Sequence, residues 1–169
     1  MRKVGGKSDL TNGLITRLGD SVLVKPRFLS RSVTEIFDEA LRPFGLSSAQ
    51  FVLLSLISQT ESITRAEIAR LQHLDRSTLT RNLKSILSEG WVEEVCDDAD
   101  GRSKPIALTA AGRDLLLNAQ SAWLEAQAHA KALLGEDGAM TLISIADRIT
   151  HPTEESSEEP SAVLFNPAG

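Results

Sequence analysis

The segment ITRAEIARLQHLDRSTLTRNLKSILSEG, residues 63–90, decides the fold that we predict for this chain of 169 residues. Thr64 is followed three residues later by Glu67, the pattern of a capping box, and Asp75 is a second N-terminal cap. The letters QHL between these caps predict a tight turn, and Gly90 is typical of the end of a helix. The segment therefore predicts two short helices joined by a turn, which is a helix-turn-helix.

The second of these helices, residues 75–88, has two faces of different chemistry. At about 100° per residue its leucines and Ile86 fall on one side, which predicts a buried stripe. The opposite face has donors and no acidic residue, whereas the face of an ordinary surface helix, the alternative, usually mixes Glu with Lys. Such donors suit phosphate oxygens and the base edges of the major groove. We therefore predict DNA contacts from Arg65, Arg76, Ser77, Thr78, Thr80, Arg81 and Lys84.

A β-hairpin follows, because the apolar period changes from helical to extended after residue 90. WVEEVC and KPIALT flank DDADGRS, in which Asp100 followed by glycine is a hairpin turn signal. Pro105 has no backbone N–H, which favours an edge position for the return strand. Arg102 and Lys104, at or beside the hairpin tip, are further predicted DNA contacts, and Asp100 is expected to hold the Arg102 guanidinium in place.

Amphipathic helices are predicted on both sides of this centre. Apolar residues recur at spacings of three and four between residues 21 and 41, and Ser47 with Gln50 forms a capping box before FVLLSLI. Thr109 is the expected cap of a long helix that ends near Leu134, and a last helix spans residues 137–150. The predicted fold class is mainly α with a small β-hairpin wing: a winged helix-turn-helix plus a helical dimerisation lobe.

The dimerisation lobe is expected from two apolar stripes. The long helix has a strict 3-4-3-4-3 spacing, which is typical of the a/d seam between two helices, and the last helix has a second stripe. Either stripe could instead pack on its own chain, and the sequence leaves that alternative open. The predicted dimer interface comprises Leu116, Ala119, Trp123, Ala126, Ala130, Leu133, Leu142 and Ile149.

Residues 63–112 resemble the winged helix of the MarR family of bacterial transcriptional regulators. The marks are DRSTLTRNLKSIL in the recognition helix, GWVE entering the wing, DGRSK at its tip and LTAAG opening the next helix. GLSSAQFVLLSLI, residues 45–57, resembles the family's second helix. One departure is CDDADG, where a proline commonly replaces Ala99 and a basic residue replaces Gly101.

The resemblance implies a homodimer that is built from the first and last helices and binds a pseudo-palindromic operator. It further implies a repressor that a small ligand or oxidation releases from DNA. It places Ser77, Thr78, Thr80 and Arg81 opposite bases or nearby phosphates, and Arg102 in the minor groove. A winged helix used only for protein interaction is the alternative from a different class.

The predicted organisation follows from these elements and from the charge pattern. Residues 64–88 carry five Lys or Arg against two Asp or Glu, a local charge of +3 in a chain of net charge −5. An acidic chain is therefore compatible with a polyanionic partner, although bases scattered over solvated faces are the alternative. We expect a mobile arm (1–20), a first dimerisation helix (21–45), the DNA-binding domain (46–110), dimerisation helices (111–150) and an acidic disordered tail (151–169).

Other classes of site have weak support in the sequence. Cys96 cannot form an internal disulfide because it is the only cysteine, which favours a cytoplasmic protein, and its acidic neighbours favour the protonated thiol. A redox-sensing regulator that uses Cys96 remains an alternative. The three histidines lack metal-ligand spacing, so we expect no metal, no cofactor and no enzyme. The expected pocket for a small, aromatic or carboxylate ligand lies between lobe and winged helix and includes Arg27, Phe37, Phe51 and Trp123.

Overall fold

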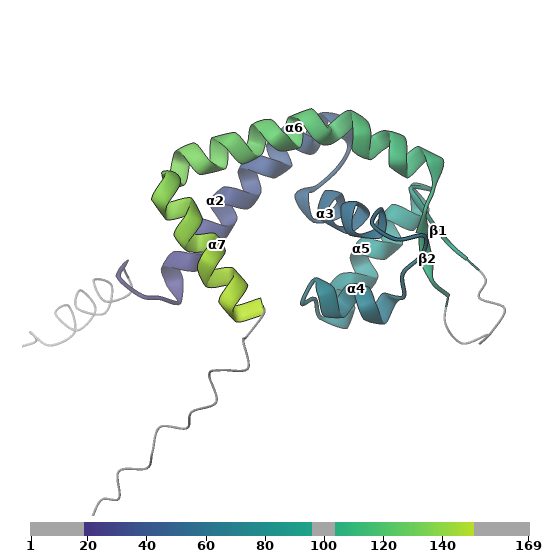
Figure 1. Cartoon of the computed structure of the whole chain (residues 1–169), viewed down its shortest axis with the longest axis horizontal. Coiled ribbons are helices and arrows are strands. Elements are labelled where there is room, and N and C mark those ends of the chain that lie inside the picture. The colour runs from purple at the N-terminus through teal and green to yellow at the C-terminus, as the bar shows by residue number, and fades with distance from the viewer. Residues whose placement is uncertain (1–18, 96–103, 151–169) are drawn as a thin grey trace, which may run out of the picture. The chain divides into compact units, whose positions relative to one another are not determined.

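The computed structural model describes residues 19–95 and 104–150 (Figure 1). The chain divides into two compact units, Met1–Ala130 and Lys131–Gly169, with the boundary inside the helix α6. The described elements are helices and one two-stranded antiparallel sheet, which confirms the predicted fold class. In chain order they are α2 (Val24–Leu41), the 3-10 turn η1 (Arg42–Phe44), α3 (Ser48–Ile57), α4 (Arg65–Leu71), α5 (Arg76–Ser88), β1 (Val92–Glu94), β2 (Ile106–Leu108), α6 (Ala110–Leu134) and α7 (Glu136–Thr150).

The predicted helix caps are confirmed as hydrogen-bonded pairs. Ser47 and Gln50 form a complete capping box at the start of α3, and Thr64 and Glu67 form another at the start of α4. The carboxylate of Asp75 accepts hydrogen bonds from two backbone N–H groups at the start of α5. These short-range signals satisfy the free N–H groups that every helix start presents, so they determine where each helix begins.

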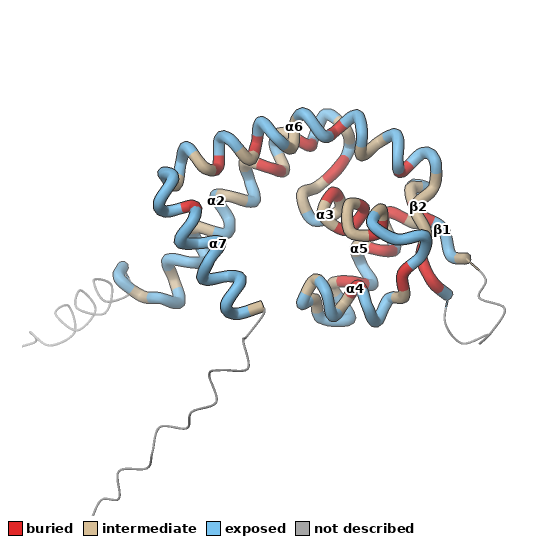
Figure 2. The backbone as a smooth tube through the Cα atoms, in the orientation of Figure 1, coloured by how far each residue is buried: buried red, intermediate tan, exposed pale blue. Residues whose placement is uncertain are grey.

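The core of the first unit is built from α3, α4, α5, the two strands and the first half of α6 (Figure 2). The predicted stripe of α5 is confirmed as part of it, since Leu79, Leu83 and Ile86 are at most 4% exposed. Burying one such side chain contributes roughly 1.5–3 kcal/mol. This packing turns the opposite side of α5 toward solvent. The other members of this core include Leu41, Leu53, Leu54, Ile57, Ile63, Ile68, Val92 and Ile106.

The return strand of the hairpin has neighbours on both sides. The backbone N–H of Val95 donates to the carbonyl of Pro105 at 2.9 Å, on the side of β1. On the other side Ile106 exchanges two backbone hydrogen bonds with Ile63, of 2.8 and 2.9 Å. The expected edge position is therefore wrong at Ile106. Pro105 fits here because its carbonyl, rather than the missing N–H, makes the pairing. The β1–β2 register pairs Val92 with Leu108, Glu93 with Ala107 and Glu94 with Ile106.

The base of the wing is joined tightly to the start of α6. The Thr109 hydroxyl donates to the Gly90 carbonyl at 2.8 Å and accepts the N–H of Gly112 at 3.1 Å, which confirms Thr109 as a cap. Its backbone N–H donates to the Trp91 carbonyl at 3.1 Å. A Cβ at position 112 would lie 2.1 Å from that same carbonyl oxygen. Only glycine therefore allows α6 to begin at this distance from β1.

The apolar stripe of α6 is largely covered by the chain itself. Ala119, Ala126 and Ala130 are at most 5% exposed, and the latter two pack with Phe37 of α2. The Trp123 ring lies 4.4 Å from the ring of Phe37, centroid to centroid. These alanines are therefore core residues of a single chain, the alternative that the sequence left open. Leu116 also packs on the core, whereas Leu133 is 58% exposed.

The helix α7 keeps its apolar side chains accessible. Among them Ile149 is 73% and Met140 is 56% exposed, and only Ala139 is buried (Figure 2). Leu142 and Ile149, both predicted interface residues, are thus exposed among the described residues. In the described ranges no single helix is long and apolar enough to cross a membrane, although the bent pair Val24–Phe44 and Ser48–Ile57 meets both criteria jointly.

Candidate nucleic-acid interface

The exposed face of α5 carries three cations that form no ion pair with any described residue. Arg76, Arg81 and Lys84 are all exposed. The ion pairs found among the described residues involve only Arg65 and Lys104, each with Glu94. The stripe of α5 that faces the core is apolar, so the helix has one buried apolar face and one cationic face. The latter is available to an anionic partner.

The hydroxyl groups on this face are less available as donors than their sequence positions suggest. The hydroxyls of Ser77 and Thr78 both donate to the Asp75 carboxylate, and that of Thr80 donates to the Arg76 carbonyl at 2.7 Å. The hydroxyl of Ser77, followed by that of Thr78, holds the pKa of Asp75 far below its usual range. The three oxygens can still accept hydrogen bonds, for example from base amino groups in the major groove.

At the base of the wing, Glu94 connects two cations from different elements. The Arg65 guanidinium, at the start of α4, donates to one carboxylate oxygen of Glu94. The Lys104 ammonium lies 3.4 Å from the other, and Arg65 also donates to the Lys104 carbonyl at 3.3 Å. The hydrogen bond from Arg65 is the main cause of a lowered pKa of Glu94. The sequence placed Arg65 and Lys104 at the interface but gave no signal for Glu94.

A cleft of about 520 Å³ lies between α4, α5 and the wing base. Its lining has three cationic side chains and no acidic one. It brings Arg65, Arg76 and Lys104, three of the predicted DNA contacts, to one place. The predicted contact Arg102 and its expected partner Asp100 lie outside the described residues, as does Cys96. The lining residues are Thr64, Arg65, Ala66, Ala69, Arg76, Leu79, Thr80 and Lys104.

The residues predicted to bind a small ligand are only partly brought together. The Trp123 ring stacks on Phe51, with 4.6 Å between centroids and 11° between planes, and both line a groove of about 510 Å³ between α3 and α6. Phe37 is buried behind Trp123 and does not line the groove. Arg27 lines a separate depression at the start of α2. The cation in the groove is instead Arg113, which sequence reasoning missed.

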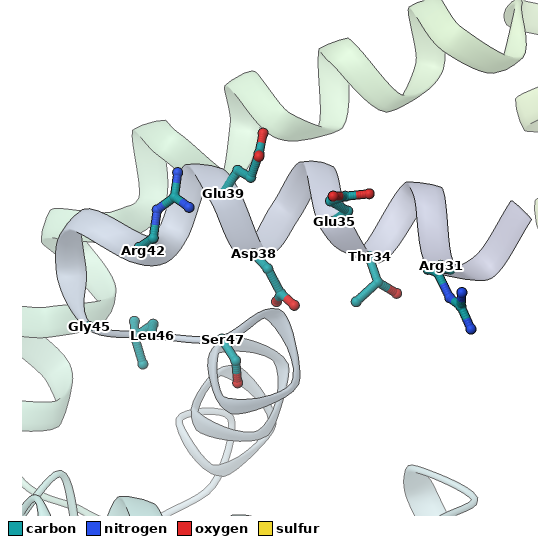
Figure 3. Close-up of a pocket in the computed structure, with 9 residues that line it drawn as sticks. All are labelled: Arg31, Thr34, Glu35, Asp38, Glu39, Arg42, Gly45, Leu46 and Ser47. Atoms are coloured by element: carbon teal, nitrogen blue, oxygen red, sulfur yellow. The ribbon is translucent and has the colours of Figure 1, made fainter. Parts of the chain in front are cut away.

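A hollow of about 770 Å³ lies between α2 and the start of α3 (Figure 3). Three carboxylates and two arginines line it, so its charge is unsuited to a polyanion. Asp38 points toward the start of α3, where it accepts the backbone N–H of Ser48 at 2.6 Å (Figure 3). The Asp38 side chain in this hollow therefore connects α2 to the start of α3. The described ranges contain no group of three or more His, Cys, Asp or Glu side chains that could hold a metal ion.

Comparison with known proteins agrees with this geometry. The sequence pattern of the MarR family matches residues 46–104. The HTH-type transcriptional repressor Rv2887 of Mycobacterium tuberculosis is 34% identical over 95 residues, which are 56% of this chain and 68% of that protein. A crystal structure of a MarR mutant from Escherichia coli complexed with operator DNA has a TM-score of 0.68 at 24% identity, over 80% of this chain and 94% of that one.

A second solved structure shares the fold. CouR from Rhodococcus jostii RHA1, bound to p-coumaroyl-CoA, has a TM-score of 0.67 at 22% identity, over 80% of this chain and 96% of that chain. The family pattern covers the helices that form the cationic face and the cleft, and the relative from M. tuberculosis matches most of its own length. The chain therefore belongs to the MarR family of transcriptional regulators.

Proposed function

We propose that this chain is a homodimeric DNA-binding repressor whose recognition helix is α5. The observation that carries the proposal is the face of α5 on which Arg76, Arg81 and Lys84 are exposed without ion pairs, opposite a buried apolar stripe. A helix with such a face fits the major groove of B-DNA, where arginine and lysine recognise guanine and phosphate. A solved structure with the same fold, a MarR mutant from Escherichia coli, is complexed with operator DNA, which supports DNA as the partner.

A selection of genomic DNA fragments by the full-length protein tests the proposal. We expect enrichment of a pseudo-palindromic sequence, with affinity that falls steeply as the salt concentration rises, because bound phosphates release counterions. The operator that is recovered would also identify the regulated genes. A chain that retains no DNA fragment at low salt, and shows no salt-dependent binding to any duplex, is not a DNA-binding protein. The protein-interaction alternative would then be favoured.

The dimer in this proposal uses the apolar side chains that stay exposed in the described part of one chain. On α7 these are Met140, Leu142, Ile143, Ile145 and Ile149, all at least 38% exposed. At the start of α2, Leu23 and Phe28 are 65% and 60% exposed. Large uncovered apolar side chains of this number are typical of a surface that another protein covers. Leu133 belongs to the same proposal, whereas the buried alanines of α6 do not.

Release of the repressor by a small ligand has its support in the groove between α3 and α6. Phe51 and Trp123 provide an aromatic wall, and the exposed Arg113 provides a cation for a carboxylate. Apolar walls with one or two convergent polar groups are typical of small-molecule sites. CouR, the neighbour bound to p-coumaroyl-CoA, binds an aromatic acyl thioester.

Arginine variants separate this groove from the pocket expected from the sequence. Titration with an aromatic carboxylate, followed by release of a bound operator duplex, should be impaired in Arg113→Ala and unchanged in Arg27→Ala. The opposite result would place the ligand at the start of α2. The redox alternative through Cys96 is tested with peroxide. We expect peroxide to release neither the wild type nor Cys96→Ser from the operator.

A further inference from the structure

We infer that the cleft between α4, α5 and the wing base holds a single backbone phosphate of the bound duplex. Arg76 supplies the free cation, and Glu94 positions the two others. This inference rests on the proposed function. It adds that one backbone phosphate binds at this place on the DNA-binding surface. The cleft lies beside the recognition helix but is formed by three different elements, Arg65 of α4, Arg76 of α5 and Lys104 of the wing base.

The charge of the cluster fits one phosphate. Three cations line the cleft, and the carboxylate of Glu94 pairs with two of them from outside the lining. Three positive charges and one negative charge leave a net charge of +2. A phosphodiester carries one negative charge. The cluster therefore attracts it and keeps a net charge of +1 when one phosphate is bound. Without Glu94 the cluster would repel itself, since like charges at short distance destabilise one another.

The donor groups that remain after the internal hydrogen bonds also fit a phosphate. A guanidinium has five N–H donors and an ammonium has three. Arg65 uses one donor on Glu94 and one on the Lys104 carbonyl, which leaves three. Arg76 has no hydrogen-bonding partner for its guanidinium among the described residues, so all of its donors are available. The anionic oxygens of a phosphate can accept several such N–H donors at once.

The threonines of the cleft do not compete for this role. Thr64 donates its hydroxyl to Glu67 at 2.7 Å, and Thr80 donates to the Arg76 carbonyl at 2.7 Å. Both hydroxyl hydrogens are therefore already used, and the free donors come from the cations alone. A guanine edge also presents only acceptors in the major groove, but it is neutral, whereas a phosphate carries the negative charge that a cluster of net charge +2 attracts. The cleft is thus suited to hold the duplex in register rather than to read its sequence.

The test is a set of operator duplexes, each with one phosphate replaced by an uncharged methylphosphonate, titrated with the full-length protein and its variants. In the wild type we expect one position per half-site at which neutralisation weakens binding by about tenfold, the effect of losing a hydrogen-bonded ion pair. With the phosphate at that position neutralised, Arg76→Ala and Arg65→Ala should bind the duplex no more weakly than the wild type does. At every other position their losses should add to that of the neutral phosphate. Sequence preference among natural duplexes should stay unchanged.

Arg70→Ala is the matched control, because Arg70 is exposed on the same helix as Arg65 but does not line the cleft. The loss of affinity in Arg70→Ala should add to the loss caused by the neutral phosphate at every position. If Arg65 and Arg76 couple to different phosphates, or to none, the cleft does not hold a shared phosphate and the inference is wrong. That result is distinguishable from failure of the proposed function. In the latter case the wild type would show no salt-dependent binding to any duplex, natural or modified.

Discussion

The helices α5 and α7 are both amphipathic, and each leaves one face exposed among the residues that the structure describes. On α5 the apolar face is buried, and the face that remains carries the unpaired Arg81 and Lys84. On α7 the apolar face itself remains, with Ile143 and Ile149 exposed. The two exposed faces therefore differ in chemistry. Cations attract an anionic partner, whereas an apolar surface packs against another apolar surface. We therefore expect the two helices to contribute to two different interfaces.

The largest effect should come from breaking the buried face of α5. Leu83 is 2% exposed, and Leu83→Ala should lower the free energy of unfolding by about 2–5 kcal/mol, because it removes buried methyl groups and leaves a cavity. Leu117→Ala, at a side chain that is 63% exposed, should change it by less than about 0.5 kcal/mol. Urea unfolding at one fixed protein concentration measures both. Equal losses in the two variants would mean that burial does not distinguish these positions.

On α7 we expect loss of assembly without loss of fold. Ile143→Glu combined with Ile149→Glu places two charges in the exposed stripe and should raise the dimer dissociation constant by about 100-fold or more, from the burial of two apolar side chains. Thr141→Glu adds one charge at an exposed polar position of the same helix and should leave the dimer intact. Light scattering gives the mass, and circular dichroism gives the helix content. A dimeric double variant would show that α7 is not covered by a second copy.

The cationic face of α5 should respond in DNA binding only. If Arg81 reads a guanine, Arg81→Ala should cost about 1–3 kcal/mol on the operator and relax preference at one base pair per half-site. Arg42→Ala, at an exposed position of η1, should leave both unchanged. The affinities for the operator, its single-base variants and random duplexes show whether Arg81 recognises a base or only attracts the DNA backbone. A uniform loss on all duplexes would assign Arg81 to a phosphate.

The smallest effect concerns the cap that begins α5. Because hydrogen bonds from Ser77 and Thr78 lower the pKa of Asp75 in the folded state, its ionised form stabilises the fold. That stability is present above the unfolded pKa, about 3.9, and is lost as the pH falls below it toward the folded pKa. Asp75→Ala should therefore lower Tm by a few degrees at pH 7, and the difference from wild type should shrink below about pH 4. A gap that is constant with pH would exclude ionisation as its cause.

Short-range signals explain why much of the fold could be predicted. The capping boxes at Ser47 and Thr64 and the cap at Asp75 each depend on residues within three positions of one another. Gly90 ends α5 with a positive φ of 70°, which few other residues adopt easily. The two faces of α5 follow from its period alone. In these places the local sequence contains both partners of the interaction, so no knowledge of the tertiary structure was needed.

Long-range partners explain what could not be predicted. The spacing of Ala119, Ala126 and Ala130 shows which side of α6 is apolar, but it does not show whether the same chain or a second chain covers that side. The pairing of Arg65 with Glu94 joins residues 29 positions apart. In the same way, Ile63 pairs with Ile106 from the other end of the domain. For the same reason the sequence could not show that Arg113, and not Arg27, lines the groove beside Phe51 and Trp123.

The contact between Gly112 and the Trp91 carbonyl has a consequence for how this sequence can change over evolution. Every residue other than glycine begins with a Cβ, and at position 112 that atom would lie 2.1 Å from the oxygen. Substitution there is therefore not graded by size or polarity: alanine should be rejected in a saturation scan as firmly as tryptophan. A descendant could accept a side chain at this position only after a prior change had moved β1 or α6. The join between wing and long helix thus constrains the order in which mutations can accumulate.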